Sequence, residues 1–141
     1  MKRTASAVWQ GDLKTGKGAL TSASGVLKST PYSFATRFGD TPGTNPEELI
    51  AAAHAGCFTM AVSAQLAGAG LTAERLETTA TLTMDKLDTG WTITAIQIDL
   101  KAKIPGAAQA AFDKAAADAK TNCPISRVLN AKISMTATLE A

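Results

Sequence analysis

The sequence predicts one α+β domain in which most neighbouring strands are antiparallel. Alternating apolar and polar residues form strand-like runs near both ends of the chain and in its middle. Between them, residues 49–73 carry no charge and are mostly small and apolar, as in a buried helix. The expected order is βββ-α-ββ-αα-β, which is typical of an α+β protein. A chain of 141 residues fits one domain, 1–141.

The first part of the chain predicts a meander of three strands. Gly16, Lys17 and Gly18 indicate a turn between the first two strands. In the third strand, Tyr32, Phe34 and Thr36 are expected on one face. The expected strands are residues 3–9, 19–26 and 31–38.

A central helix is predicted after the loop 39–44. Asn45 is a preferred N-cap residue, Pro46 suits the first helical position, and Glu47 and Glu48 favour the first turn. Glu48 lies three residues after Asn45, where it can complete a capping box. The helix is expected over residues 46–67 and to end at the glycines 68 and 70.

The second half of the chain predicts a long hairpin, two helices and a last strand. Asp88, Thr89 and Gly90 are turn residues between two alternating runs, which indicates a hairpin. Pro105 and Gly106 end the second run. The expected elements are strands 76–87 and 91–104, helices 107–120 and 125–129, and a strand 131–139.

The charge composition argues against a nucleic-acid partner. The 14 Lys and Arg residues are scattered along the chain, and the net charge is only +2. Nucleic-acid binding requires a basic stripe, and the sequence contains none. Because charged residues make up only 18% of the chain, apolar surface remains exposed, and we expect self-association.

The uncharged stretch 49–73 is long enough to span a bilayer, but Ser, Thr, Gln and His interrupt it. We therefore expect a buried helix and no membrane partner. Residues 1–9 begin with basic residues but lack the apolar segment of a signal peptide. This predicts a cytoplasmic location, where cysteines are more often free, catalytic or metal-bound than locked in structural disulfides.

The two cysteines, Cys57 and Cys123, are the first candidates for chemistry. A free cysteine in the middle of a helix, as Cys57 would be, is often a small buried hydrophobic residue. Cys123 precedes Pro124 at an expected helix start, where backbone N–H groups favour a thiolate. Local physics alone therefore indicates that Cys123 is the more easily ionised thiol.

Arg37 and Glu47 lie at the two ends of the loop 39–44. Each has a simple structural explanation, because Arg37 can be a solvated charge and Glu47 a first-turn acid. Since the loop joins the expected third strand to the central helix, the two side chains could meet at its neck.

His54 is the only histidine and lies three residues before Cys57. We interpret it as a hydrogen-bonded helix histidine rather than a catalytic base. A zinc site could use His54, Cys57, Cys123 and a carboxylate. Zinc ligands usually occur in more closely spaced pairs, so no metal is expected.

Four segments together resemble the OsmC family, the osmotically inducible relatives of the organic hydroperoxide resistance proteins. The resemblance extends over nearly the whole chain and is nearer to the OsmC branch. It implies the OsmC-like fold with a central buried helix and an intertwined homodimer. The segments are Trp9-x-Gly11-Asp12, residues 31–38 (PYSFATRF), residues 43–58 (GTNPEELIAAAHAGCF) and residues 122–129 (NCPISRVL).

The same resemblance implies a thiol-dependent peroxidase that acts in stress defence. Cys57 would attack an organic hydroperoxide and Cys123 would resolve the sulfenic acid as a disulfide. Arg37 would stabilise the thiolate, and Glu47 would orient the arginine. No cofactor is implied, but a small or protein dithiol must reduce the disulfide from outside. A competing class is a dimeric redox sensor that reacts once without turnover.

Helix geometry limits how such a site is assembled. Glu47 and Cys57 lie ten residues apart on one expected helix, which separates their backbones by about 15 Å along its axis. A rotation of about 1000° also places the two side chains on different faces. We therefore expect Arg37 and Glu47 of one chain to serve Cys57 of a partner chain. The alternatives are a strongly bent helix or an arginine that folds back within its own chain.

Overall fold

The computed structural model describes residues 1–141 and divides into two compact units, Met1–Leu49 and Ile50–Ala141. One helix, α2, begins in the first unit and continues into the second. The division of the chain into a single domain, 1–141, stays a prediction. The elements are β1 (Ala5–Gln10), β2 (Lys17–Ser22), β3 (Thr30–Tyr32), α1 (Phe34–Phe38), α2 (Pro46–Gly68), β4 (Arg75–Leu87), β5 (Gly90–Lys103), α3 (Gln109–Asn122), α4 (Pro124–Val128) and β6 (Lys132–Glu140).

The first unit contains an antiparallel sheet of order β1-β2-β3, as the meander predicted. Its first turn lies earlier than expected, because the Asp12 carboxylate accepts backbone hydrogen bonds from Lys14 and Thr15 at 2.8 and 3.0 Å. Lys17 and Gly18 therefore already belong to β2, and that strand ends at residue 22 rather than 26.

The prediction of a strand over residues 31–38 is wrong beyond Tyr32. Residues Phe34–Phe38 form the short helix α1, because Ser33 caps it. The Ser33 hydroxyl accepts from the backbone N–H of Thr36, and the Thr36 hydroxyl accepts from the N–H of Ser33. This capping box outweighs the alternating pattern, which five residues are too few to establish. Arg37 consequently lies on a helix and not at the end of a strand.

Helix α2 begins and ends where the sequence indicated. The Asn45 Oδ1 accepts from the N–H of Glu48 at 2.8 Å, so Asn45 is the N-cap. Asn45 also donates to the carbonyl of Thr36 at 3.2 Å, which ties the start of α2 to α1. At the other end, Gly70 has a φ of 72°, and Leu71 N–H donates back to Leu66 O at 2.9 Å.

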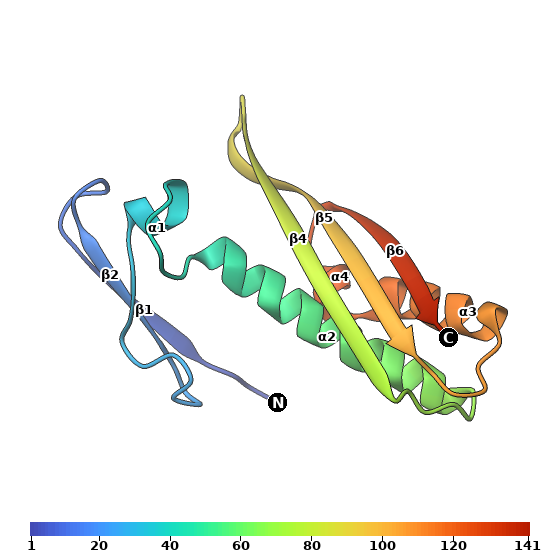
Figure 1. Cartoon of the computed structure of the whole chain (residues 1–141). Helices are drawn as coiled ribbons and strands as arrows, with labels where there is room; N and C mark the ends of the chain where they lie inside the picture. Colours follow the sequence, from blue (N-terminus) through green and yellow to red (C-terminus); the bar gives the residue numbers. More distant parts are fainter. The chain divides into compact units, whose positions relative to one another are not determined.

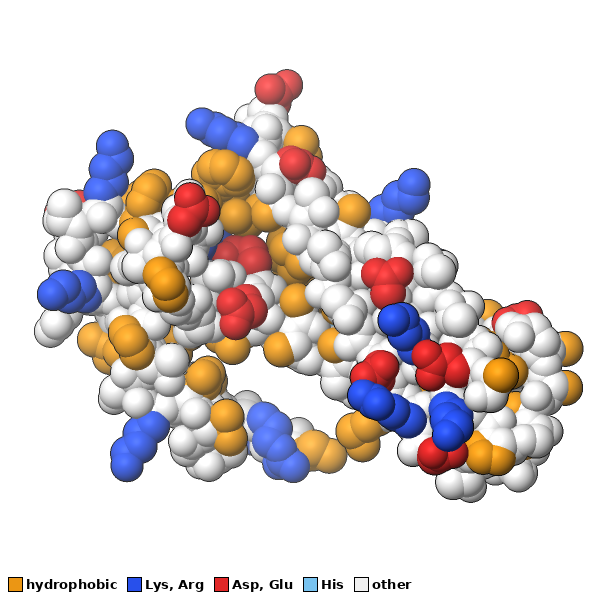
Figure 2. Space-filling view, viewed as in Figure 1, with side chains coloured by type: hydrophobic (Ala, Val, Ile, Leu, Met, Phe, Trp, Pro, Cys, Tyr) orange, Lys and Arg blue, Asp and Glu red, His pale blue; other side chains and the backbone are white.

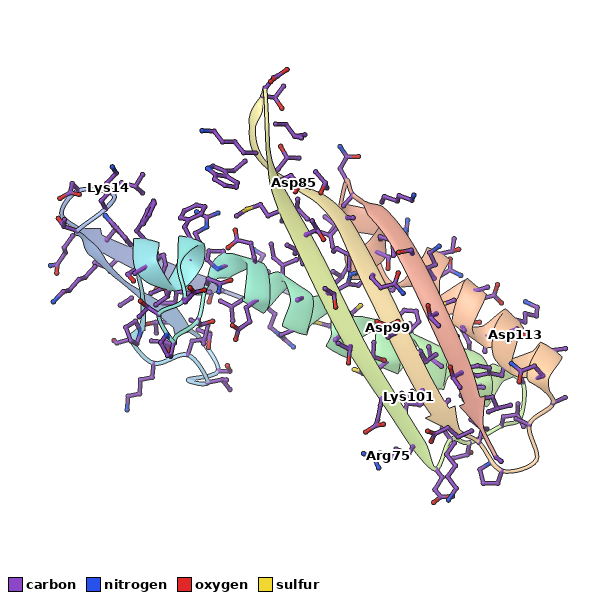
Figure 3. The ribbon with its side chains drawn as sticks, turned by 45° about the horizontal axis from the view of Figure 1, so that its top comes forward. Lys14, Arg75, Asp85, Asp99, Lys101 and Asp113 are labelled. Atoms are coloured by element: carbon purple, nitrogen blue, oxygen red, sulfur yellow. The ribbon has the colours of Figure 1, made fainter.

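The second unit contains a sheet of order β4-β5-β6 (Figure 1). Strands β4 and β5 form the expected hairpin, closed by the two-residue turn 88–89. Strand β6 pairs with β5 in parallel, and this is the one parallel pair. Figure 3 shows Asp99 and Lys101 on β5, both exposed. The α+β class with mostly antiparallel pairing is therefore confirmed.

The core of the second unit lies between this sheet and helices α2 and α3. Residues of β5 alternate between buried and exposed positions, so one face of the strand is covered. In α2, the buried positions recur every four residues and form one stripe. The largest buried apolar side chains are Phe58, Val62 and Leu66 of α2, Ile96, Ile98 and Leu100 of β5, and Phe112 of α3.

The opposite face of α2 is exposed in the single chain. It is a stripe of small and apolar side chains with Met60, at 76% exposure, near its middle. Helix α2 is also long and apolar enough to cross a membrane by composition, but its buried stripe identifies it as a core helix. The exposed stripe consists of Ala53, Gly56, Met60, Ala64 and Ala67.

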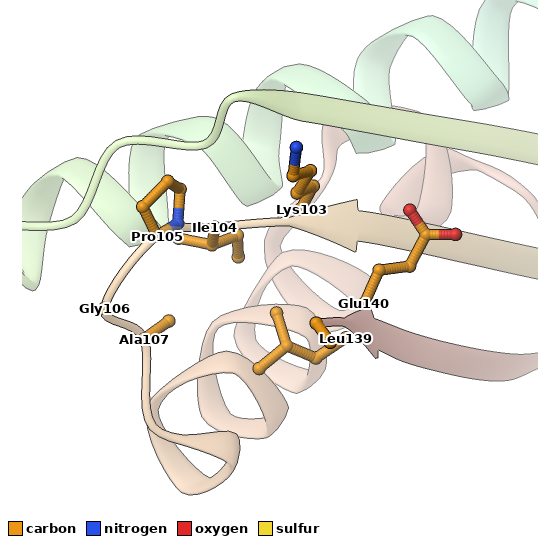
Figure 4. A pocket seen from close by; sticks show the side chains of 8 residues that line it. Lys103, Ile104, Pro105, Gly106, Ala107, Leu139 and Glu140 are labelled. Carbon is orange, nitrogen blue, oxygen red and sulfur yellow. The ribbon is translucent and has the colours of Figure 1, made fainter.

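The surface carries charges of both signs, interspersed on the face in view (Figure 2). A cavity of about 500 Å³ lies where β5 and β6 end and is lined by Lys103, Pro105 and Glu140 among others (Figure 4). It contains neither cysteine.

Candidate functional site

The two cysteines meet in the second unit although 66 residues separate them in sequence. Cys57 comes from the middle of α2, and Cys123 lies at the junction of α3 and α4. The Cys123 and Cys57 Sγ atoms lie 2.9 Å apart, within hydrogen-bond distance, and both thiols are free. Cys123 is fully buried, whereas Cys57 is half-buried, so a small molecule can reach Cys57 first.

Cys123 is held by a break between two helices. Its N–H donates to Ala119 O at 2.8 Å and closes α3, while its carbonyl accepts from Arg127 at 3.0 Å and opens α4. Pro124 stands at the first position of α4, where a missing N–H does no harm. This junction fixes the Cys123 side chain against α2.

The two thiols differ in how easily they ionise. Burial raises the pKa of Cys57, and its hydrogen bond with Cys123 raises it further. Burial is also the largest influence on Cys123, but hydrogen bonds from Cys57, Ser126 and Ile125 outweigh it and lower the pKa of Cys123. This agrees with the expectation from local sequence that Cys123 is the more easily ionised thiol.

His54 lies one turn before Cys57 and is fully buried. Its Nε2 is 2.8 Å from the hydroxyl oxygen of Ser126, a residue 72 positions away in sequence. The interpretation of His54 as a hydrogen-bonded helix histidine is therefore confirmed. Ser126 was not expected at the site. It follows Cys123 by three residues, a spacing that places it on the same side of a helical turn.

Arg37 and Glu47 meet in the first unit, as the loop between them suggested. The Arg37 Nε lies 3.1 and 3.2 Å from the two Glu47 carboxylate oxygens, and its Nη2 donates to Oε1 at 2.7 Å. Such paired hydrogen bonds fix the plane of the guanidinium. Gly43 makes the loop possible, because its φ is 150° and a Cβ there would lie 2.8 Å from Thr36.

An aromatic pocket of about 250 Å³ adjoins Arg37 within the first unit. The guanidinium carbon lies 5.1 Å from the centre of the Phe38 ring, which forms one wall. Sequence analysis missed this pocket, because its lining comes from two strands, a turn and α1. The lining residues are Trp9, Leu13, Tyr32, Ser33, Phe34, Arg37 and Phe38.

The four predicted site residues thus form two pairs, the thiol pair in the second unit and the Arg37–Glu47 pair in the first. The zinc alternative would require a carboxylate beside His54, Cys57 and Cys123. No group of three or more His, Cys, Asp and Glu side chains lies close enough together to hold a metal ion.

Comparison with known proteins places the chain in a family. The family model described as OsmC-like protein matches residues 38–138. Peroxiredoxin OsmC of Escherichia coli (strain K12) is 48% identical over 127 residues, which cover 90% of this chain and 89% of that protein. The chain belongs to the OsmC family. Peroxiredoxin OsmC of Shigella flexneri matches with the same identity and coverage. These matches confirm the predicted enzyme class, a thiol-dependent peroxidase.

Solved structures confirm the OsmC-like fold. An OsmC-like protein of unknown function from Vibrio cholerae has a TM-score of 0.79 at 15% identity, covering 98% of this chain and 99% of that chain. An organic hydroperoxide resistance protein from Elizabethkingia anophelis has a TM-score of 0.75 at 23% identity and covers 99% of both chains. At these identities the likeness concerns the fold alone.

The thiol contact in this OsmC-family chain predicts an intrachain disulfide. Because the two sulfurs already lie 2.9 Å apart, little movement is required to reach the bond length of about 2.05 Å. Protein oxidised with peroxide should run as a monomer on a non-reducing gel, and peptide mapping should join Cys57 to Cys123. Cys123→Ser, which cannot form the bond, is the control. A covalent dimer as the main oxidised product of the wild-type protein would contradict this prediction.

Proposed function

We propose that this chain reduces organic hydroperoxides to alcohols, with Cys57 as the peroxidatic thiol and Cys123 as the resolving thiol. The observation that carries this proposal is the 2.9 Å contact between the two free thiols. Two cysteines in contact within one chain can form a disulfide and release it again, which a repeated catalytic cycle requires. The greater exposure of Cys57 supports its role as the thiol that meets the peroxide.

The reaction has three balanced steps. The Cys57 thiolate takes the terminal oxygen of the hydroperoxide, the O–O bond breaks, and the alkoxide leaves and gains a proton to become the alcohol. Cys57 is now a sulfenic acid. Cys123 attacks its sulfur, the S–O bond breaks, and water is released as the disulfide forms. An external dithiol then reduces the disulfide and is itself oxidised.

The proposed role of Arg37 follows from the electrostatics of Cys57. Since burial raises the pKa of this thiol, it requires a cation nearby to ionise at neutral pH. A guanidinium never loses its charge in this range, and that of Arg37 is 37% exposed and therefore accessible. Glu47, at 14% exposure, would hold the guanidinium in a fixed orientation. No cofactor or metal is required by this chemistry.

The aromatic pocket supports a substrate with an apolar organic group. Its walls carry Trp9, Phe34 and Phe38 beside the Arg37 guanidinium, so an alkyl or aryl chain could pack there while the peroxide lies near the cation. Phe58 and Met60, two residues of α2, are less suitable: Phe58 belongs to the buried core and Met60 projects from the exposed stripe.

A homodimer would bury the exposed stripe of α2. Small residues let a second backbone approach closely, and a low content of charge leaves apolar surface to cover. The dimer would also supply Arg37 and Glu47 to Cys57 from the partner chain, an arrangement supported by the ten-residue separation of Glu47 and Cys57 along α2. We place the enzyme in the cytoplasm, where dithiol reductants are present, with a role in oxidative or osmotic stress defence.

A steady-state assay separates a catalyst from a redox sensor. With excess dithiol, the protein should consume many equivalents of cumene hydroperoxide, whereas a sensor stops near one equivalent. The aromatic pocket predicts a kcat/KM for cumene hydroperoxide at least about tenfold above that for hydrogen peroxide, equivalent to burying roughly two methylene groups. Consumption that ends after one equivalent would establish the sensor instead.

A further inference from the structure

His54 and Ser126 are two buried polar residues that the proposed reaction leaves unused. They come from α2 and α4 and are joined by the 2.8 Å contact between Nε2 and Oγ. Ser126 is only 9% exposed and lies in α4 three residues after Cys123, the N-cap residue of this helix, and its side chain is among the groups that lower the pKa of Cys123. The hydroxyl is therefore placed to link the imidazole to one of the two thiols.

The direction of these hydrogen bonds follows from the number of protons available. A serine hydroxyl has one proton, so if it donates to the Cys123 sulfur it must accept from His54. His54 then carries its proton on Nε2. Its other ring nitrogen, Nδ1, is buried without a partner, which is tolerable for an unprotonated acceptor but costly for an orphaned N–H donor. Burial also lowers the pKa of His54, which favours the neutral ring.

We propose that His54 and Ser126 form a hydrogen-bond chain that holds Cys123 as a thiolate, with Ser126 touching the sulfur and His54 as a positioning residue behind it. This inference rests on the proposed function, because it assigns the chain to the resolving thiol. It gives the only histidine a role in the second and third steps of the cycle and none in the attack on the peroxide.

The chain acts twice in the cycle without changing its own protonation. In resolution, the Cys123 thiolate attacks the sulfur of the Cys57 sulfenic acid, the S–O bond breaks, and the hydroxide that leaves takes a proton from solvent. In recycling, a reductant thiolate attacks the Cys57 sulfur, the disulfide bond breaks, and Cys123 leaves as a thiolate into the same hydrogen bond. A stabilised thiolate is the better leaving group.

The direct test is a thiolate titration of Cys123 by ultraviolet absorbance in a Cys57→Ser background, where Cys123 is the only thiol. Ser126→Ala and His54→Leu should each raise the pKa of Cys123. His54→Gln, which keeps an N–H donor near the position of Nε2, should restore it. Thr59→Val is the matched control, because it removes a hydroxyl of the same helix α2 that hydrogen-bonds to Ala55 and to Thr78 of β4 and to neither cysteine.

Apart from His54, which is itself replaced in two of the variants, the titratable and charged groups around Cys123 are the same in every variant of this series. Cys57 of α2, which contacts the sulfur directly, is replaced throughout. Lys120 lies in the last turn of α3, and Arg127, in the last turn of α4, is exposed. A difference between the variants therefore reports on the Ser126–His54 chain.

A second measurement follows single turnover in the protein with both cysteines. Ser126→Ala and His54→Leu should slow disulfide formation at neutral pH by about threefold or more, because fewer Cys123 thiols are ionised while each thiolate is somewhat more nucleophilic. His54→Gln should resolve at the rate of the wild type. The rate of the first step, measured by sulfenic acid formation, should change far less than the rate of the second.

Two results would overturn the inference. If the pKa of Cys123 is unchanged in Ser126→Ala, the proposed hydrogen-bond chain does not exist. If the pKa of Cys123 is unchanged in His54→Leu but raised in Ser126→Ala, His54 is not part of the hydrogen-bond chain. The titration requires no peroxide, so it tests the chain independently of the proposed function. If the variants shift the pKa of Cys123 but the wild-type protein does not turn over peroxide, the chain is supported and the proposed function is contradicted.

Discussion

Replacing Cys57 by serine is expected to lower kcat for peroxide turnover by about a thousandfold or more, because a serine hydroxyl cannot replace the attacking thiolate. Coupled consumption of cumene hydroperoxide with excess dithiol measures this loss. The Thr59→Val variant, changed two residues further along α2, should retain activity and serves as the control. Near-normal turnover in Cys57→Ser would mean that the proposed mechanism is wrong.

The companion variant Cys123→Ser should behave differently. It keeps the attacking thiol, so it should still reduce about one equivalent of peroxide. Without the resolving thiol 2.9 Å away, Cys57 should then persist as a sulfenic acid that dimedone traps and mass spectrometry detects. The contrast between the two variants shows which cysteine attacks the peroxide and which resolves the sulfenic acid. Equal loss of the first equivalent in both would contradict that assignment.

A mixture of two inactive chains is expected to recover activity if the site is shared between protomers. Helix α2 is continuous from Pro46 to Gly68, and Glu47 and Cys57 lie ten residues apart along it. That spacing corresponds to about 15 Å of axis, more than a glutamate side chain can cross. The Arg37 guanidinium is tied to Glu47 by hydrogen bonds of 2.7 to 3.2 Å, so its position follows that of Glu47.

Co-expression of Arg37→Ala and Cys57→Ser chains tests this arrangement. In a mixed dimer, one site would combine an intact Cys57 with an intact Arg37 from the partner. With random pairing, half of the dimers are mixed, and each mixed dimer has one complete site of two. The unfractionated protein should therefore show roughly a quarter of wild-type activity. Mixed dimers purified through two different tags should show about half of the wild-type peroxide turnover.

The control for this experiment is a mixture in which one chain carries both substitutions and the other is wild type. Its mixed dimers keep one complete set of residues on a single chain, so a site built within each chain would remain active there. The test dimer pairs one Arg37→Ala chain with one Cys57→Ser chain. If this purified dimer is inactive while the control dimer is active, each chain builds its own site.

Local signals predicted the elements that depend on neighbours in sequence. The cap at Asn45, the glycine end of α2 and the two-residue hairpin turn at 88–89 are all where their residues indicated. The third strand was misjudged because Ser33 and Thr36 form a capping box that an alternating pattern conceals. A hydroxyl residue followed three positions later by another was the signal that could have revealed it.

The α+β class, the central helix, the family and the proximity of Arg37 to Glu47 across a short loop could all be inferred from the sequence. These inferences rest on caps, alternation, motifs and short distances along the chain. The long-range contacts of the site depend on the tertiary structure: Cys57 meets Cys123 across 66 residues, and His54 meets Ser126 across 72. No local pattern encodes such contacts, because they arise when burial of the apolar stripe of α2 brings α4 against it.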